Sequence, residues 1–183
     1  MNVVALDIPD VQLITPKRFS DSRGFFSEVY NARALADAGI DIVFVQDNHA
    51  FSSQTGTLRG LHFQKPPHAQ TKLVRVTRGR IYDVAVDIRP GSPTYGRHVG
   101  VELSAGNWSQ LLVPAGFAHG YCTLEPDTEV LYKVDAYYAP EHDAGILWSD
   151  PALAISWPVA ADMAQLSDKD LRLPLFKDVG PAF

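Results

Sequence analysis

The stretch Thr57–Gln64 combines side chains that can do chemistry with side chains that favour a β-strand. It places the guanidinium of Arg59, the flexible Gly60 and the imidazole of His62 among apolar residues. An imidazole changes its charge near neutral pH, which suits it to accept a proton. In a regular strand Arg59 and His62 point to opposite faces, but a bulge at Gly60 would bring them to one pocket. The stretch therefore predicts either a half-buried strand with a core histidine or one wall of a site.

The segment Pro114–His119 raises the question of a metal ion. It resembles the second cupin motif, in which a histidine near the end of a strand often binds metal. In the first cupin motif a glutamate precedes a glycine, but at the matching distance before Gly79 this chain has Lys72. Pro66 holds the place of one of that motif's two histidines, so that only His68 remains. An ammonium group cannot ligate a cation and repels it, so we expect no metal site.

Without a metal, a pocket containing His62, Lys72 and Tyr132 indicates general acid–base chemistry. His62 can accept a proton, Lys72 can stabilise an oxyanion as it develops, and the phenol of Tyr132 can return a proton. Each residue alone also fits a structural role, Lys72 as a solvated strand residue and Tyr132 as a core aromatic with a wet hydroxyl. The chemical interpretation requires that the fold bring the three together.

Nine stretches of the chain together resemble the dTDP-4-dehydrorhamnose 3,5-epimerase family, which has a cupin fold and uses no metal. They lie in the family's order and cover the chain from about residue 8 to residue 175. Any one of them is weak, but nine in order are highly specific. The stretches are Asp21–Glu28, Gln46–His49, Leu58–Gln64, Lys72–Arg75, Asp83–Asp87, Pro114–Gly120, Tyr132-Lys133 with Tyr137–Pro140, Gly145–Trp148 with Asp150-Pro151, and Ser167–Asp170.

The resemblance implies a substrate and a mechanism. The substrate would be a dTDP-linked 4-keto-6-deoxyhexose, dTDP-4-dehydro-6-deoxy-D-glucose, whose C3 and C5 hydrogens are acidified by the ketone at C4. The product would be dTDP-4-dehydro-L-rhamnose, and no cofactor is implied. His62 would be the base, held and polarised by Asp170. Lys72 would stabilise the enolate oxygen, and Tyr132 would return a proton from the opposite face.

The resemblance also implies where the substrate binds. Arg23 and Arg59 match the positions that clamp the diphosphate, and Tyr138 matches the aromatic residue that stacks on thymine. Further positions that match the family's ligand contacts are Phe26, Glu28, Gln46, Asp47, Asn48, His119, Asp143 and Lys169. Two positions depart from the family's commoner residues: Asp143 replaces glutamate, which shortens its reach, and Ser149 replaces asparagine.

One further residue follows from the strand Ile81–Ile88. In this strand Tyr82, Val84, Val86 and Ile88 alternate with a small, acidic face made of Asp83, Ala85 and Asp87. We expect Asp83 on that face to orient His119.

Four other functions stay open. An epimerase that acts at C3 or C5 alone can carry the same His62, Asp170 and Lys72, as can a sugar ketoisomerase, because these enzymes differ in pocket shape. A metal-dependent cupin oxygenase would need a ligand where Lys72 stands. A sugar-nucleotide-binding module without catalysis would not need these residues together with Tyr132.

Composition and charge restrict the class of protein. The 183-residue chain is 46% hydrophobic and 20% charged, which is typical of a soluble globular protein, and we expect residues 1–183 to form one domain. Its net charge of −5 argues against non-specific binding to nucleic acid or to anionic membranes. The single cysteine, Cys122, rules out an internal disulfide, which suits a reducing compartment. Neither a signal peptide nor a membrane-spanning run is evident, so we expect a cytoplasmic protein. The family resemblance implies a homodimer whose subunits lend residues to each other.

Short apolar runs separated by Pro, Gly, Asn and Asp predict about ten strands and few helices. This pattern indicates an all-β jelly roll, and the family resemblance specifies the double-stranded β-helix of cupins with a few short peripheral helices. We expect Lys72–Thr77 and Ile81–Ile88 to pair as a hairpin across Arg78–Arg80, and Phe25–Tyr30 to form a strand after a turn at Asp21–Gly24.

Two short helices are expected outside the strands. Asn31 is a suitable N-cap for a helix over Ala32–Ala38, and Gly39 is suited to end it. A second helix is expected around Ser167–Leu171, with Ser167 as its cap.

Overall fold

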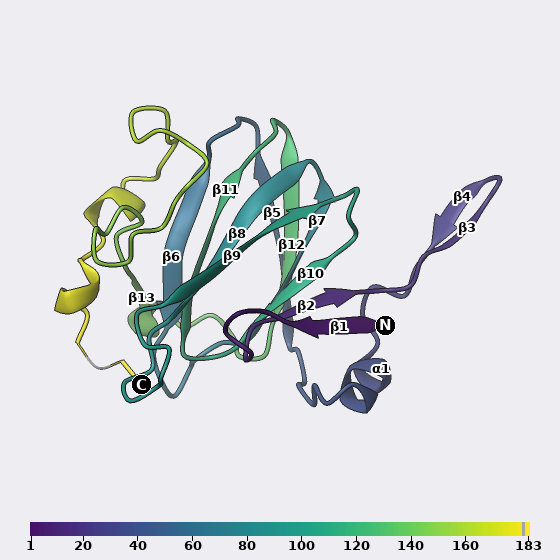
Figure 1. The fold of residues 1–183 in the computed structure, drawn as a ribbon, viewed down its shortest axis with the longest axis horizontal. Coiled ribbons are helices and arrows are strands. Elements are labelled where there is room, and N and C mark those ends of the chain that lie inside the picture. The colour runs from purple at the N-terminus through teal and green to yellow at the C-terminus, as the bar shows by residue number, and fades with distance from the viewer. Residues whose placement is uncertain (181) are drawn as a thin grey trace.

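The computed structural model describes residues 1–180 and 182–183, and its main feature is two antiparallel β-sheets (Figure 1). The six-stranded sheet consists, in spatial order, of β1 (Asn2–Ala5), β2 (Gln12–Thr15), β10 (Gln110–Val113), β7 (Lys72–Arg78), β12 (Thr128–Val134) and β5 (Gln46–Ser52). The five-stranded sheet consists of β13 (Asp143–Gly145), β6 (Leu58–Gln64), β11 (Phe117–Thr123), β8 (Arg80–Asp87) and β9 (His98–Ser104). The predicted all-β jelly roll is confirmed.

The chain switches sheets directly after β7, so the predicted hairpin between residues 72–77 and 81–88 was wrong. Strand β7 lies between β10 and β12, whereas β8 lies between β11 and β9 in the other sheet. The corner is at Gly79, whose φ of +76° suits glycine and whose added Cβ would lie 2.2 Å from the Thr128 hydroxyl. A glycine turn between two apolar runs is equally compatible with a hairpin within one sheet and with a corner that leads into the other sheet. Here the chain turns a corner.

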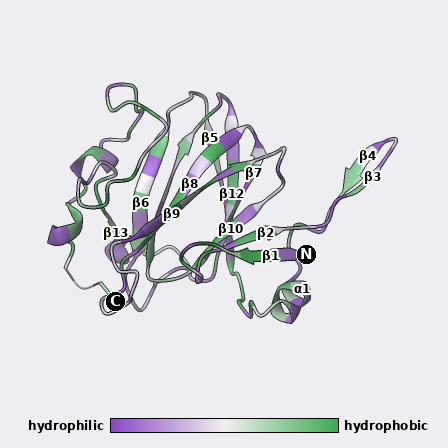
Figure 2. Ribbon diagram, viewed as in Figure 1, coloured by the Kyte–Doolittle hydropathy of each residue, from purple (hydrophilic) through white to green (hydrophobic). Residues whose placement is uncertain are grey.

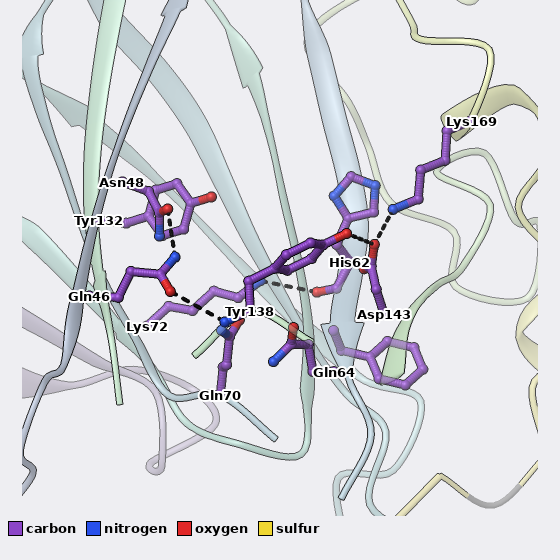
Figure 3. A pocket seen from close by; sticks show the side chains of 11 residues that line it. Gln46, Asn48, His62, Gln64, Gln70, Lys72, Tyr132, Tyr138, Asp143 and Lys169 are labelled. Carbon is purple, nitrogen blue, oxygen red and sulfur yellow. Dashed lines mark hydrogen bonds and ion pairs between the residues drawn. The ribbon is translucent and has the colours of Figure 1, made fainter. Parts of the chain in front are cut away.

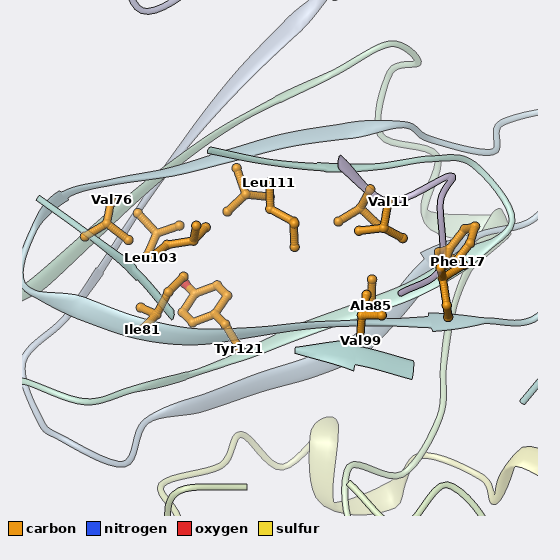
Figure 4. Close-up of a cluster of buried hydrophobic side chains, with 13 residues drawn as sticks. Val11, Val76, Ile81, Ala85, Val99, Leu103, Leu111, Phe117 and Tyr121 are labelled. Carbon is orange, nitrogen blue, oxygen red and sulfur yellow. The ribbon is translucent and has the colours of Figure 1, made fainter. Parts of the chain in front are cut away.

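The main hydrophobic core lies between the two sheets (Figure 4). Val76 and Leu111 from the six-stranded sheet face Ile81, Ala85 and Leu103 from the five-stranded sheet. A fully buried aliphatic side chain of this kind stabilises the fold by roughly 1.5–3 kcal/mol. Ala85 belongs to this core, so the acidic face of β8 points between the sheets.

Each sheet is covered on its outer face by non-strand segments. Residues 146–180 wrap over the five-stranded sheet, where Leu153 and Trp157 pack against Leu61 and Val86. This covering segment contains the 3₁₀ helices η2 (Asp170–Arg172) and η3 (Phe176–Asp178), and η1 (Pro140–His142) precedes it. The predicted helix at 167–171 is therefore a 3₁₀ turn that begins later, at Asp170.

The helix α1 (Ala32–Asp37) covers part of the six-stranded sheet through Leu35. Asn31 caps it as predicted, because its side-chain oxygen accepts a hydrogen bond from the Ala34 amide at 3.1 Å. Gly39, the residue after the C-cap Ala38, has a φ of +87°, the left-handed conformation in which a glycine commonly ends a helix. None of the helices in the described part of the chain is long and apolar enough to cross a membrane.

A two-stranded hairpin, β3 (Phe19–Asp21) and β4 (Gly24–Phe26), projects away from the sheets (Figure 1). Figure 2 shows hydrophobic residues on it, and Phe19, Phe25 and Phe26 are all more than half exposed. The predicted strand over residues 25–30 was wrong in extent, because β4 ends at Phe26 where its pairing with β3 ends. Exposed aromatic residues on a projecting arm are typical of a surface that another chain covers.

Candidate active site

Two adjoining cavities of about 250 and 240 Å³ lie between the sheets. Both are lined by His62, Lys72 and Tyr132, and we refer to them as the first and second lobes of one pocket. The first lobe (Figure 3) is also lined by Gln46, Asn48, Phe63, Gln64, Gln70, Tyr138, Asp143 and Lys169. The second lobe is also lined by Ala50, Arg59, His119, Tyr121, Ser167 and Asp170.

Arg59 and His62 share the second lobe because β6 is irregular at Gly60. The pairing of β6 with β11 shifts register between His119 and Tyr121, opposite this glycine. Gly60 has a φ of +126°, and an added Cβ would lie 2.6 Å from the Cα of Gly120. A residue with a side chain therefore cannot take this place without strain or displacement of β11. The predicted irregularity at Gly60 is confirmed.

A short hydrogen bond links His62 to the C-terminal segment. His62 Nε2 lies 2.6 Å from Oδ1 of Asp170, which is 4% exposed. Ser167 donates its hydroxyl to Asp170 Oδ2 at 2.7 Å and accepts the Asp170 amide at 3.1 Å. Burial acts to raise the pKa of Asp170, but the hydrogen bonds from His62 and Ser167 outweigh it, and the net pKa lies below the usual value. An ionised Asp170 only accepts, so Nε2 of His62 carries the hydrogen and Nδ1 is left to take a proton.

Lys72 is a buried cation in the same pocket. Only 8% of the residue is exposed, and its ammonium donates to the His62 carbonyl oxygen at 3.2 Å. Burial lowers the pKa of Lys72 from 10.5 to about 8, although Asp83 and Asp143 act to raise it. The amine is therefore mostly charged at neutral pH and ready to stabilise a developing anion.

Tyr132 faces His62 from the other side of the cavity (Figure 3). It projects from β12 of the six-stranded sheet, whereas His62 projects from β6 of the five-stranded sheet. Burial raises the pKa of Tyr132, and the nearby Arg59 only partly opposes this. Its phenol is therefore protonated at neutral pH and can act as an acid.

His119 forms a second imidazole–carboxylate pair at the wall of the second lobe. Its Nε2 lies 2.7 Å from Oδ1 of Asp83, and both residues are buried, at 7% and 0% exposed. The expected contact between Asp83 and His119 is confirmed, whereas its effect on activity stays a prediction.

Asp143 joins three segments at the first lobe despite its short side chain (Figure 3). Its Oδ2 accepts the Tyr138 hydroxyl at 3.1 Å and forms an ion pair with Lys169. The hydrogen bond to Asp143 raises the pKa of Lys169 and also that of Tyr138. On the other side of Tyr138, its amide donates to Gln46 Oε1 at 3.2 Å, and Gln46 in turn donates to Asn48 at 2.9 Å.

Three residues expected at the substrate lie outside both lobes because of the projecting hairpin. Arg23 is at the hairpin turn and forms an ion pair with Asp21 at 2.6 Å. Phe26 is 66% exposed at the end of the hairpin, and Glu28 follows it and accepts from Asn31 at 3.2 Å. Within one subunit, these three residues do not join the pocket.

Asp47 is also outside the pocket. It lies on β5 between Gln46 and Asn48, so strand alternation points it to the outer face of the sheet. There it forms an ion pair with Lys133 at 2.8 Å. Within this chain, Asp47 does not share the cavity with its two neighbours.

Several lining residues were not predicted. Gln64 and Tyr121 could have been found from alternation, since each lies two residues after a predicted histidine, His62 or His119, on the same strand. Gln64 is almost fully buried, and its side chain accepts the Ala139 amide at 2.8 Å, which holds the segment next to Tyr138. No sequence signal indicated Gln70 or Ala50.

The fold is a cupin-type jelly roll whose pocket holds an imidazole on one sheet, a phenol on the facing sheet and a buried ammonium, which are groups suited to acid–base chemistry. Within residues 1–180 and 182–183, no three His, Cys, Asp or Glu side chains gather as they would around a metal ion. The sequence model of the dTDP-4-dehydrorhamnose 3,5-epimerases matches residues 5–178. The chain belongs to the dTDP-4-dehydrorhamnose 3,5-epimerase family and is an isomerase.

Similar proteins span the whole chain. The dTDP-4-dehydrorhamnose 3,5-epimerase of Sinorhizobium fredii is 51% identical over 179 residues, which cover 98% of this chain and 91% of the relative. A crystal structure of the Bacillus anthracis enzyme with TDP and PPi bound is 55% identical, with a TM-score of 0.92 and coverage of 95% and 98% of the two chains. The Legionella pneumophila 3,5-epimerase in complex with dTDP-4-keto-L-rhamnose is 45% identical, with a TM-score of 0.93 and coverage of 97% and 94%.

Proposed function

We propose that the pocket converts dTDP-4-dehydro-6-deoxy-D-glucose into dTDP-4-dehydro-L-rhamnose by inverting C3 and C5. The observation that carries this proposal is that His62 and Tyr132 line one cavity from facing sheets, with the buried Lys72 beside them. The complexes of the relatives with TDP and with dTDP-4-keto-L-rhamnose support a dTDP-linked sugar as the ligand. No step needs a cofactor.

Binding of the substrate draws on the polar lining of the two lobes. Arg59 supplies a guanidinium for the diphosphate, since a planar fork suits phosphate oxygens. Tyr138 supplies an aromatic face for thymine, and Gln46 and Asn48 supply amides. His119, Asp143 and Lys169 supply further polar contacts around the sugar and the nucleotide.

The first chemical step is removal of a proton from carbon. The ketone at C4 acidifies the hydrogens at C3 and C5, and His62 takes one of them while Asp170, at 2.6 Å, stabilises the imidazolium that forms. A positioned base of this kind accelerates a reaction by roughly a hundred- to ten-thousand-fold. The electrons of the broken C–H bond move to the C4 oxygen, which becomes an enolate.

The enolate oxygen is stabilised by Lys72. Its ammonium is desolvated, so its interaction with a new negative charge is stronger than it would be in water. Removing such a donor costs roughly 3–4 kcal/mol of transition-state stabilisation.

The second proton comes from Tyr132. Because it approaches from the sheet opposite His62, the proton arrives at the other face of the carbon and inverts the centre. His62 then releases its proton to solvent and the tyrosinate regains one, after which the second carbon reacts in the same way. Each inversion therefore places one solvent hydrogen on carbon.

The enzyme is proposed to be a homodimer in which the β3–β4 hairpin of one subunit reaches the pocket of the other. Support comes from the exposed aromatic residues on the hairpin and from Arg23, whose side chain is 88% exposed although it matches a diphosphate clamp position. An arm that carries binding residues but lies outside its own pocket has a role only if another chain receives it.

We also propose that residues 1–183 form one domain and that the protein works in the cytoplasm. Segments from both ends of the chain pack onto the two central sheets, which supports a single domain. The buried free thiol of Cys122 suits a reducing compartment, and the net charge of −5 disfavours nucleic acid and anionic membranes as partners. Limited proteolysis and cell fractionation test these two statements.

The decisive experiment is incubation with dTDP-4-dehydro-6-deoxy-D-glucose in heavy water, with C3 and C5 followed by NMR. Deuterium should enter at both carbons, and His62→Ala should abolish both exchanges. Deuterium at one carbon alone would indicate a mono-epimerase, and no exchange by the wild-type protein would refute the proposal.

A further inference from the structure

The Ser167–Asp170 turn belongs to a loop, residues 166–175, that we call the carrier loop. It contains no strand and is attached at its first end through the backbone of Gln165. The Gln165 carbonyl accepts the Leu58 amide, and the Gln165 amide donates to the Gly56 carbonyl, both at 2.9 Å. This end of the loop is therefore fixed to the start of β6 by main-chain bonds that a side-chain substitution does not remove.

The other end of the carrier loop is held by a main-chain bond at Pro174 and, two residues further on, by a side chain. Asp150 is 4% exposed, and its Oδ2 accepts the amide of Phe176 at 2.5 Å from 26 residues away in the chain. Its Oδ1 accepts the Ala152 amide at 2.7 Å. Phe176 begins η3, whose own N-cap residue, Leu175, makes no side-chain cap bond, so Asp150 supplies the acceptor that this turn lacks.

Between Asp170 and Phe176 the carrier loop passes over the strand pair that holds His62. Gly145 on β13 is the direct register partner of His62 on β6. A Cβ on Gly145 would lie 2.8 Å from a methyl group of Leu173, so this leucine lies closely against the backbone there. The Leu147 amide then donates to the Pro174 carbonyl at 2.8 Å. A displacement at Phe176 is therefore passed to Asp170 through a short, closely packed stretch.

We propose that Asp150 is a positioning residue for the proton-abstracting pair: by holding Phe176 it sets the separation of Asp170 from His62. The inference rests on the proposed role of His62 as the base. Asp150 itself lines neither lobe and touches no group that reacts. Catalytic geometry must hold to a fraction of an ångström, and supporting hydrogen bonds at a distance maintain it.

The variant Asp150→Asn tests the proposal with little change in size. Asp150 accepts from Ala152 and Phe176 with two different oxygens, and asparagine has an acceptor at only one of these positions, so one bond is lost and the hold of residue 150 on Phe176 weakens. We expect kcat to fall about tenfold with KM changed less than twofold, because a shift of roughly an ångström at a reacting group is costly.

The pH profile supplies a readout that a purely structural role would not move. Hydrogen bonds from His62 and Ser167 keep the pKa of Asp170 low, so losing the His62 bond lets burial raise that pKa. Asp170 then becomes protonated at a higher pH, and the acid limb of kcat/KM moves upward. Besides His62, the charged or titratable side chains that line the second lobe with Asp170 are Arg59, Lys72, His119, Tyr121 and Tyr132. Lys169 precedes Asp170 in the chain, and none of these groups is altered in the variant.

A control and a double variant complete the test. Trp157→Phe removes another partly buried hydrogen bond of the same covering segment, from Trp157 Nε1 to the Trp148 carbonyl at 2.8 Å. It should lower the melting temperature and leave the pH profile unchanged. The double variant Asp150→Asn/Asp170→Asn should have the same kcat as Asp170→Asn alone, because Asp150 acts through Asp170.

An unchanged pH profile in Asp150→Asn, or an effect that multiplies with that of Asp170→Asn, overturns the inference. If Asp150→Asn is too unstable to assay, Leu173→Ala loosens the same end of the loop and must give the same shift and the same non-additivity. All variants are compared with an active wild-type enzyme, so a failure here is distinct from a failure of the proposed epimerisation.

Discussion

His62 and Tyr132 line the same pocket from two different sheets. His62 projects from β6 in the five-stranded sheet and Tyr132 from β12 in the six-stranded sheet, and the cavity lies between them (Figure 3). In the proposed reaction the sugar ring lies between these two side chains, with one on each side. Inversion of a carbon needs this arrangement, because a base and an acid on one face would return the proton to where it came from.

Tyr132→Phe should separate exchange from inversion. The ring and its packing remain, while the hydroxyl that we propose returns the proton is lost. His62 can still remove and return a proton on its own face, so exchange in heavy water continues while epimerisation falls by roughly a hundred- to ten-thousand-fold. Tyr137→Phe is the matched control, since Tyr137 is 68% exposed, lines neither lobe and should leave both rates unchanged. Equal losses of exchange and epimerisation in Tyr132→Phe would contradict this assignment.

The alkaline limb of activity should belong to Lys72. Its folded-state pKa of about 8 means that the ammonium loses its proton as the pH rises through that value, and with the proton it loses the charge that we propose stabilises the enolate. Activity should therefore decline above about pH 8. Lys72→Met should lower kcat roughly a hundred- to a thousand-fold and abolish this limb. Lys133→Met, outside both lobes and paired with Asp47, should leave the limb in place. A Lys72→Met profile with the wild-type alkaline limb would assign it to another group.

Asp83→Ala should weaken activity through His119. The carboxylate holds Nε2 of this buried imidazole at 2.7 Å, and without it His119 loses its fixed orientation in the second lobe. Asp87→Asn is the control from the same face of the same strand: Asp87 is equally buried but bonds Arg89, Ser92 and Thr94 away from the pocket. Both changes should reduce stability by about 1–3 kcal/mol, and only Asp83→Ala should reduce kcat/KM. Unchanged kinetics in Asp83→Ala would remove the role.

Mixing two inactive variants tests the shared site. If the hairpin of one subunit completes the pocket of its partner, Arg23→Ala and His62→Ala impair the same site from different chains. In a mixed dimer one site then receives wild-type Arg23 and wild-type His62, and activity should return to about a quarter of the wild-type level after random exchange of subunits. Lys72→Met serves as the control partner for His62→Ala, because both residues line the pocket of the same chain, so no site of their mixed dimer has both and activity should not return. A monomer in sedimentation, or no recovery on mixing, would refute the homodimer with shared sites.

The elements fixed by local chemistry were predictable from sequence. The cap at Asn31 and the glycine that ends α1 depend on one hydrogen bond and one backbone angle, and both are as expected. The shared pocket of Arg59 and His62 followed from a single glycine in an otherwise regular strand. In these places a few neighbouring residues decide the outcome.

The elements that depend on distant packing were not predictable. The turn at Gly79 carries the same local signal whether the chain folds back in one sheet or crosses to the other, and the choice is made by burial of both faces of β8. Arg23 and Phe26 match ligand positions by sequence, yet the β3–β4 hairpin that carries them projects away from the pocket of its own chain. Asp47 was expected in the pocket through family resemblance, although alternation on β5 already pointed it outward.

Gly60→Ala should damage both stability and catalysis. Alanine at a φ of +126° is strained by roughly 1–3 kcal/mol, and its Cβ would lie 2.6 Å from the Gly120 Cα, so β6 and β11 must separate. This separation moves Arg59 and His62 apart, and kcat/KM should fall at least tenfold in the same variant. Gly91→Ala is the matched control, because Gly91 has a φ of +85° with nothing within 4 Å of the added Cβ and lies outside both lobes. The melting temperature should fall in both variants because of backbone strain, while only Gly60→Ala should lose activity. Wild-type kinetics in a folded Gly60→Ala protein would show that the irregularity in β6 is not what aligns the two side chains.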